Sequence, residues 1–232
     1  MDKKRKNVVF GIVVSVAVVM LIVFGTLACL GVFRGFNAQG YVSAILDQTI
    51  KGNVEVAAEM TEGTTEEALL AQYNAGIESF VKNTLLNKMT IDSELEEKYI
   101  ALCKKIFAKL DYSVQEAEKV SDDEFHVLVK YRPTNIMNVY VEAVNSEVQR
   151  ANEKKEKGEY RGTYEEIFAQ MTSDTMANAY TALEEAYNNM EFGEEQKVIF
   201  KVIKEEDGLY KLEESSITKF LVKILSLDVK QD

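Results

Sequence analysis

The sequence predicts an α+β protein in which an N-terminal transmembrane helix precedes helices packed on a four-stranded antiparallel sheet. Three observations lead to this prediction. A long uncharged run opens the chain, segments with strand-like alternation occur in two separate places, and two long stretches with helical spacing lie between them. The composition, 47% apolar and 28% charged, is that of an ordinary globular protein. We therefore expect a long helical hairpin inserted between two strand pairs.

The uncharged run extends from Val8 to Phe33. As a helix it is about 39 Å long at ~1.5 Å per residue, which is enough to cross a hydrocarbon core of about 30 Å with some tilt. Helix is the expected state because lipid offers no hydrogen-bond partner to an unpaired backbone group. The run therefore predicts a transmembrane helix over residues 8–33.

Basic residues on either side of this run predict its orientation. Four consecutive bases, Lys3 to Lys6, precede the run, whereas Arg34 alone follows it directly. Cytoplasmic flanks carry the excess of Lys and Arg. Residues 1–7 are thus expected to form a cytoplasmic tail, and residues 36–232 an extracytoplasmic domain.

Two alternatives for the N-terminal segment stay open. A cleaved signal peptide has a shorter apolar core, of about 7–15 residues, and an A-x-A-like site, which is missing here. A lipoprotein signal would end at Cys29, and Ala28 fits the small residue required before the lipidated cysteine. Thr26 and Leu27 fit that pattern poorly, and apolar residues continue to Phe33. The uncleaved anchor is the favoured interpretation.

The net charge of −11 is unevenly distributed. The first 34 residues hold five of the 27 bases and one of the 38 acids, so the remaining chain is strongly acidic. Such a domain repels a phosphate backbone, and nucleic acid is not an expected partner. It also repels an anionic lipid surface, so we expect the domain to stand off the bilayer.

The first half of the outer domain reads as helices followed by a strand pair. Two short helices are expected over 36–60, broken near Gly52-Asn53. Capping boxes at Thr64 and Ser93 then open two amphipathic helices. Cys103 lies on the apolar stripe of the second and is expected to be a small buried hydrophobe without a disulfide partner. Strands are predicted over 112–120 and, from strict alternation, 125–131.

The second half begins with the helical hairpin. Helices are expected over 135–155 and, from a capping box at Thr163, to about Met190. Strands over 197–204 and 209–212 follow, joined by a turn at 206–208, and a last amphipathic helix starts near Ser215. Because isolated two-stranded hairpins are marginal in water, the two pairs should join into one sheet.

No constellation of catalytic or metal-binding residues is evident in the sequence. The single histidine, His126, cannot build a zinc site without cysteine partners, and the acidic clusters lack the spacing of a calcium loop. No nucleotide-binding or hydrolase motif is present. We therefore predict no catalytic residues, no metal and no cofactor. Tyr131 and Arg132, at the end of a strand beside Pro133, are the candidate ligand-binding residues at a pocket rim.

Three segments resemble a group of uncharacterised extracytoplasmic domains from clostridial Gram-positive bacteria, which are anchored by a transmembrane helix or a lipobox. They are the run from Phe36 to Gly52, Tyr131-Arg132-Pro133-Thr134, and Phe220-Leu221-Val222-Lys223-Ile224-Leu225. The resemblance implies a cell-envelope location and an α+β fold similar to the cone-shaped nuclear-transport-factor-like domains. The long helical hairpin departs from that simple pattern. The group carries no known activity.

These observations together predict a membrane-tethered, non-enzymatic binding or sensing domain at the cell surface. A ligand, or a partner from the cell envelope, is expected between the sheet and the helices. Two alternatives stay open. One is a hydrolase of cell-wall polymers that uses paired carboxylates. The other is a structural partner in an envelope complex, which should expose a large apolar patch.

Overall fold

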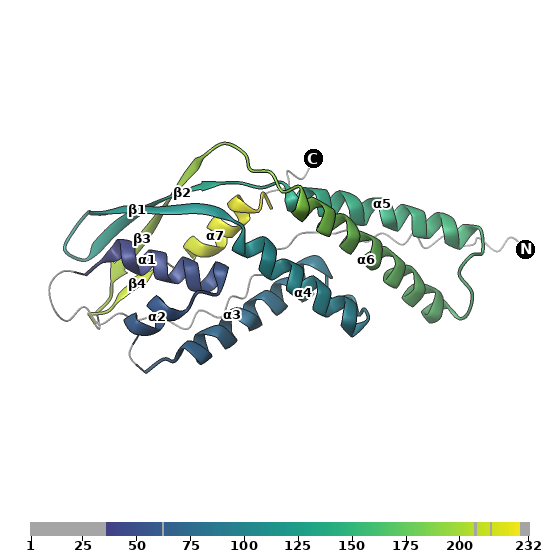
Figure 1. Ribbon diagram of the computed structural model, residues 1–232, viewed down its shortest axis with the longest axis horizontal. Helices are drawn as coiled ribbons and strands as arrows, with labels where there is room; N and C mark the ends of the chain where they lie inside the picture. Colours follow the sequence, from purple (N-terminus) through teal and green to yellow (C-terminus); the bar gives the residue numbers. More distant parts are fainter. Residues whose placement is uncertain (1–35, 62, 207, 214, 228–232) are drawn as a thin grey trace, which may run out of the picture.

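The computed structural model describes residues 36–227 except 62, 207 and 214. Figure 1 shows a body, in which helices cover a twisted sheet, and an arm of two helices that extends from one end of it. The predicted tail, the predicted span from Val8 to Phe33 and Cys29 lie outside the described residues. Within the described part of the chain, no helix is long and apolar enough to span a bilayer.

The first segment contains two helices separated at Gly52, as predicted. Helix α1 (Ala38–Leu46) continues as the π-helical turn η1 (Asp47–Lys51), and α2 (Glu55–Met60) follows. Gly52 ends η1 with φ +72°, a left-handed conformation in which glycine carries no Cβ penalty. The glycine at position 52 therefore determines where the first helical segment ends.

The caps of the next two helices each lie one residue away from the predicted caps. Helix α3 (Glu66–Phe80) is capped by Thr65, whose Oγ1 accepts from the backbone N–H of Ala68 at 3.2 Å. It continues as η2 (Val81–Leu85). Helix α4 (Ser93–Ala108) is capped by Asp92, which accepts from Glu94 N–H at 2.8 Å. The predicted caps Thr64 and Ser93 are wrong because each helix has a better-placed oxygen on a neighbouring residue in extended conformation.

Four strands form one antiparallel sheet, as predicted. They are β1 (Asp111–Lys119), β2 (Glu124–Arg132), β3 (Gln196–Lys204) and β4 (Tyr210–Leu212), in spatial order β1-β2-β3-β4. Strand β1 carries a bulge between Val114 and Ala117 opposite β2. The arm is thus inserted between the two central strands, β2 and β3.

One face of the sheet forms the main core. Val127, Val129, Phe200 and Val202 are fully buried on this face. Helix α7 (Ser215–Ile224) packs here through Phe220, whose ring lies 5.4 to 5.8 Å from three rings of the sheet. Side chains therefore fill the space between the sheet and α7, and a ligand elsewhere between the sheet and the helices stays a prediction.

Cys103 belongs to the same core. Its side chain is 1% exposed, and burial raises the pKa of its thiol. It is the one free cysteine found among the described residues, which confirms the prediction of a buried hydrophobe.

The arm consists of α5 (Ile136–Glu156) and α6 (Tyr164–Asn188), packed along each other. The predicted capping box is confirmed: Thr163 Oγ1 accepts from Glu166 N–H, and the Glu166 carboxylate accepts from Thr163 N–H at 2.7 Å. The base of the arm is hydrogen-bonded to the body. The Tyr140 hydroxyl donates to the carbonyl of Leu85 at 2.9 Å. The outer half of the arm extends past the body into solvent (Figure 1).

Candidate functional site

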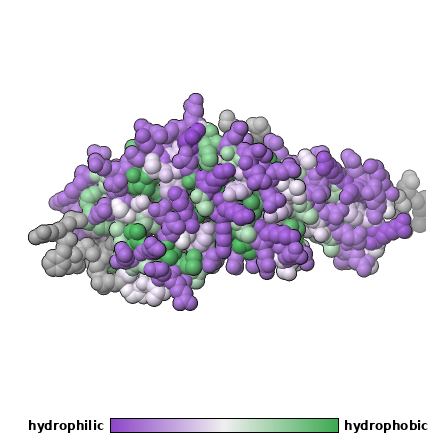
Figure 2. All heavy atoms as spheres, viewed as in Figure 1, coloured by the Kyte–Doolittle hydropathy of each residue, from purple (hydrophilic) through white to green (hydrophobic). Residues whose placement is uncertain are grey.

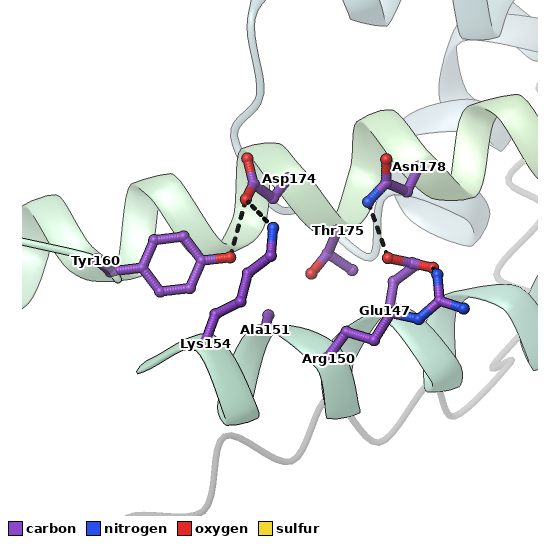
Figure 3. A pocket seen from close by; sticks show the side chains of 8 residues that line it. All are labelled: Glu147, Arg150, Ala151, Lys154, Tyr160, Asp174, Thr175 and Asn178. Atoms are coloured by element: carbon purple, nitrogen blue, oxygen red, sulfur yellow. Dashed lines mark hydrogen bonds and ion pairs between the residues drawn. The ribbon is translucent and has the colours of Figure 1, made fainter. Parts of the chain in front are cut away.

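A cleft of about 190 Å³ opens between the two helices of the arm (Figure 3). Since a liquid water occupies about 30 Å³, there is room for about six waters or one small molecule. Both helices contribute lining residues, and most of these are charged or polar. They are Glu147, Arg150, Ala151 and Lys154 from α5, Tyr160 from the connecting loop, and Asp174, Thr175 and Asn178 from α6.

One end of the cleft is built around the carboxylate of Glu147, whose side chain is only 11% exposed. One oxygen accepts from Arg150 Nη1 at 2.6 Å, and the other accepts from Asn178 Nδ2 at 2.8 Å. The second contact joins α5 to α6. This end therefore holds one carboxylate, fixed by two hydrogen bonds, and one solvent-facing guanidinium.

The other end is built around Asp174. Its Oδ2 accepts from Lys154 Nζ at 3.2 Å and from the Tyr160 hydroxyl at 2.9 Å. Burial, and then the hydrogen bond to the Asp174 carboxylate, raise the pKa of Tyr160 to about 12. The phenol therefore stays a neutral donor at physiological pH.

The floor between the two ends is made of small side chains. Ala151 is 2% exposed and Thr175 is 1% exposed. The Oγ1 of Thr175 finds no hydrogen-bond partner among the described residues, although it lies at the cleft (Figure 3). A helical threonine ordinarily bonds the carbonyl four residues earlier, as Thr181 does with Ala177 at 3.3 Å. This hydroxyl is buried beneath the floor of the cleft, and an unpaired polar atom of this kind is uncommon in a folded protein.

The two ends are separated by about two helical turns. Glu147 and Lys154 are seven residues apart on α5, which is about 10 Å at ~1.5 Å per residue. Each end carries one acid and one base, so the cleft has no net charge. The arrangement fits an elongated small molecule with polar or charged groups at both termini and little bulk in the middle.

The two sequence-predicted ligand residues lie elsewhere, on opposite faces of β2. Tyr131 is 2% exposed, and its hydroxyl donates to Gln196 Oε1 at 2.8 Å. Arg132 is exposed, and its Nε donates to the carbonyl of Gly193 at 3.0 Å. The structure does not bring these side chains together. Both have partners within the fold, and their part in ligand binding stays a prediction.

His126 lies on the outer face of β2, where its Nε2 is 2.7 Å from Glu124 Oε1. Among the residues that the structure describes, no group of three or more His, Cys, Asp or Glu side chains could hold a metal ion. The two carboxylates of the cleft do not form a metal-binding group either, since each is paired with a cationic side chain.

The sequence did not predict the cleft, because the inner faces of α5 and α6 were interpreted as continuous apolar stripes. The two small residues Ala151 and Thr175 on these faces are the sequence feature that could have indicated a gap. Small side chains at facing positions leave a gap between packed helices. Which residues face each other depends on the register of the hairpin, and only the tertiary structure gives that register.

The surface of the arm is hydrophilic on the face shown in Figure 2, and hydrophobic residues on the body occur there in small groups. Among the described residues, the large hydrophobics that are exposed are Val56, Leu70, Val120, Tyr164, Phe168, Ile199 and Ile203. They come from five different elements or loops of the body and the arm. Such scattered exposure is ordinary for the surface of a folded domain.

The fold defines the class to which this domain belongs: an α+β domain with a helical arm between its central strands. No protein-family model matches the chain, and no curated protein matches it significantly. A solved structure of a candidate lipoprotein, ycdA, from Bacillus subtilis is similar, with 14% identity and a TM-score of 0.52. The match covers 82% of this chain and 56% of that one, so this chain spans little more than half of its length. At this identity the likeness shows the fold alone.

Proposed function

We propose that this chain is a membrane-tethered, extracytoplasmic, non-enzymatic binding domain that takes up a small zwitterionic ligand in the α5–α6 cleft. The observation that carries the proposal is the cleft itself, in which an acid–base pair lies at each end of a floor of small side chains, Ala151 and Thr175.

The location rests on the sequence and on the fold. The run from Val8 to Phe33 predicts the anchor, and the bases before it predict the orientation. The similar fold of a candidate lipoprotein from a Gram-positive bacterium supports the same compartment. Lipidation at Cys29 is the alternative means of attachment.

The ligand class follows from the charges and the spacing of the cleft. Each acid is paired with a base in the cleft, so a ligand ammonium would share Glu147 or Asp174 with its present partner, and a ligand carboxylate would share Arg150 or Lys154. A separation of about 10 Å between the ends equals about three residues of extended peptide at 3.3–3.6 Å each. A short peptide with free termini therefore fits in length, charge and bulk.

Binding is favoured over hydrolysis because neither carboxylate is arranged as a general acid. Each already accepts a hydrogen bond from a cation and one from a neutral donor. A glycosidase needs one carboxyl group that is free to reach and protonate the leaving oxygen, whereas each of these carboxylates is held by two donors of the fold. The paired-carboxylate hydrolase is for this reason the weaker alternative.

The binding test uses the purified full chain in lipid nanodiscs, with triglycine as the probe. Triglycine should raise the melting temperature in proportion to the logarithm of its concentration, as expected for a ligand that binds only the folded state. N-acetyltriglycine and triglycine amide each lack one terminal charge and should bind more weakly. If none of the three peptides changes the melting temperature, the proposed ligand class is wrong.

Matched variants locate the site. Asp174→Asn and Thr175→Val should each reduce the triglycine-induced shift, because they remove a charge and a hydroxyl from the cleft. Thr181→Val is the control, since that hydroxyl is exposed on the same helix and bonds only its own backbone. Equal responses of Thr175→Val and Thr181→Val would place the binding site outside the cleft.

A further inference from the structure

The first residue of the described domain is fixed in an aromatic cluster at one end of the sheet. The ring of Phe36 stacks on Tyr210 with 3.9 Å between centroids and an interplanar angle of 9°. It also contacts the ring of Phe125 at 5.7 Å and that of Tyr41 at 5.5 Å. The chain therefore enters the fold at a defined point, with β2, β4 and α1 all contributing to that point.

The covalent distance from this point to the predicted membrane span is short. Phe33 ends the uncharged run, and three peptide units lead from it to Phe36. Even fully extended, three residues span about 11 Å at most. The interfacial layer of one leaflet is about 5–8 Å thick, so Phe36 must lie at or just above the lipid headgroups.

The turns that surround Phe36 share this position. The Tyr210 hydroxyl lies 3.5 Å from the carbonyl of Asp122, and the N–H of Lys204 donates to the carbonyl of Asp123 at 2.8 Å. The β1–β2 and β3–β4 turns are thereby joined at the same end of the sheet. We call this end, formed by Phe36 and the two turns, the proximal end.

The charge of the whole domain disfavours a flat arrangement on lipid. Residues 35–232 hold 37 acids and 22 bases. Anionic lipid headgroups repel such a surface, and they repel it more strongly when a long side of the domain lies on the bilayer than when one end does. A domain that is tied closely at one end and repelled along its sides is expected to stand upright.

The arm extends away from the proximal end. Strand β2 starts there at Glu124 and runs about 30 Å over its nine residues to Arg132. Helix α5 begins four residues later and continues in the same general direction for about 30 Å (Figure 1). The tip of the arm and the proximal end therefore lie at opposite ends of the long axis.

From this geometry we infer that the proximal end faces the lipid headgroup layer and that the α5–α6 arm points away from the membrane, presenting its cleft outward. The inference rests on the proposed membrane tether. It assigns the headgroup layer, and not another protein, as the neighbour of the β1–β2 and β3–β4 turns. The short connection between Phe33 and Phe36 determines this orientation, and adsorption of the domain surface to lipid does not.

The test measures the proximity of two fluorophores to lipid, using the full chain in vesicles that contain a headgroup-labelled quencher lipid. The background variant is Cys29→Ala, and Cys103 can stay because its buried thiol will not react. Single labels are placed at Val120→Cys in the proximal end and at Glu159→Cys at the tip of the arm. Both positions are exposed. Quenching at position 120 should exceed that at position 159 several-fold.

A flexible Gly/Ser insert between Gly35 and Phe36 is the matched control. It lengthens the link without changing the domain, and it should reduce the difference between the two labels. Equal quenching at both positions, stronger quenching at position 159, or a difference that survives the insert each overturns the inference. Vesicle flotation tests the tether separately. If the protein floats with the vesicles, these outcomes overturn the inferred orientation but not the proposed membrane tether. If the protein does not float with them, the tether and the inference both fail.

Discussion

The hydroxyl of Tyr99 on α4 donates a 2.8 Å hydrogen bond to the carbonyl of Met176 on α6. Both residues are fully buried, and the bond links the body to the arm across a long sequence separation. The ring of Tyr99 also meets Tyr140 of α5 edge to face at 6.2 Å. The junction that holds the arm is therefore made of tyrosines that combine apolar area with a satisfied polar tip.

Tyr99→Phe should destabilise the protein by about 0.5–1.5 kcal/mol, because it removes a buried hydrogen bond while the carbonyl of Met176 keeps its place in helix α6. Chemical denaturation measures the change in unfolding free energy. Tyr180→Phe is the control, since its hydroxyl reaches Glu184 at the surface, and it should change stability by less than about 0.5 kcal/mol. Equal effects of the two variants would mean that the junction does not depend on this bond.

Thr175→Val should stabilise the protein while it weakens ligand binding. The substitution keeps the side-chain shape and removes a buried hydroxyl that has no partner among the described residues. The expected gain is about 1 kcal/mol, measured as a higher denaturation midpoint without a change in slope. A loss of stability would show that the hydroxyl has a partner in solution, such as an ordered water.

Stability should fall at high pH through Tyr160. Its folded-state pKa is raised to about 12 from 10.0, so the folded state prefers the neutral phenol. The resulting contribution is complete below pH 10 and is lost as the pH rises towards about 12. Asp174→Asn removes the second-largest cause of the shift, so phenolate formation, followed by ultraviolet absorbance, should begin at lower pH in that variant. An unchanged titration would contradict the Tyr160–Asp174 hydrogen bond.

Gly52→Ala should destabilise the junction of η1 and α2. The position has φ +72°, and an added Cβ would lie 2.7 Å from Cε1 of Tyr73. The left-handed conformation alone costs an L-residue about 1–2 kcal/mol. Gly76→Ala is the matched control, because that glycine is within α3 and has open space around it. The control should be neutral or stabilising by about 0.5–1 kcal/mol. Thermal melts of both variants compare the two effects.

Local sequence patterns predicted most elements of the fold. The alternation from Phe125 to Tyr131 identified β2, because a strand with one buried face repeats every two residues. Thr163 and Glu166 identified the start of α6, because a capping box needs only residues three apart. The caps of α3 and α4 were each missed by one residue, since two adjacent polar side chains compete there and packing selects between them.

What the sequence by itself determined is the order and type of the elements, the single four-stranded sheet and the apolar run that predicts the anchor. These depend on periodicity and composition, which are properties of neighbouring residues. The tertiary structure alone decided which side chains of α5 and α6 face each other. Thr175 and Glu147 are 28 positions apart in sequence, and the hairpin register brings them to one cleft. It also decided where Phe36 enters the fold, because three rings from separate elements have to meet before that position is fixed.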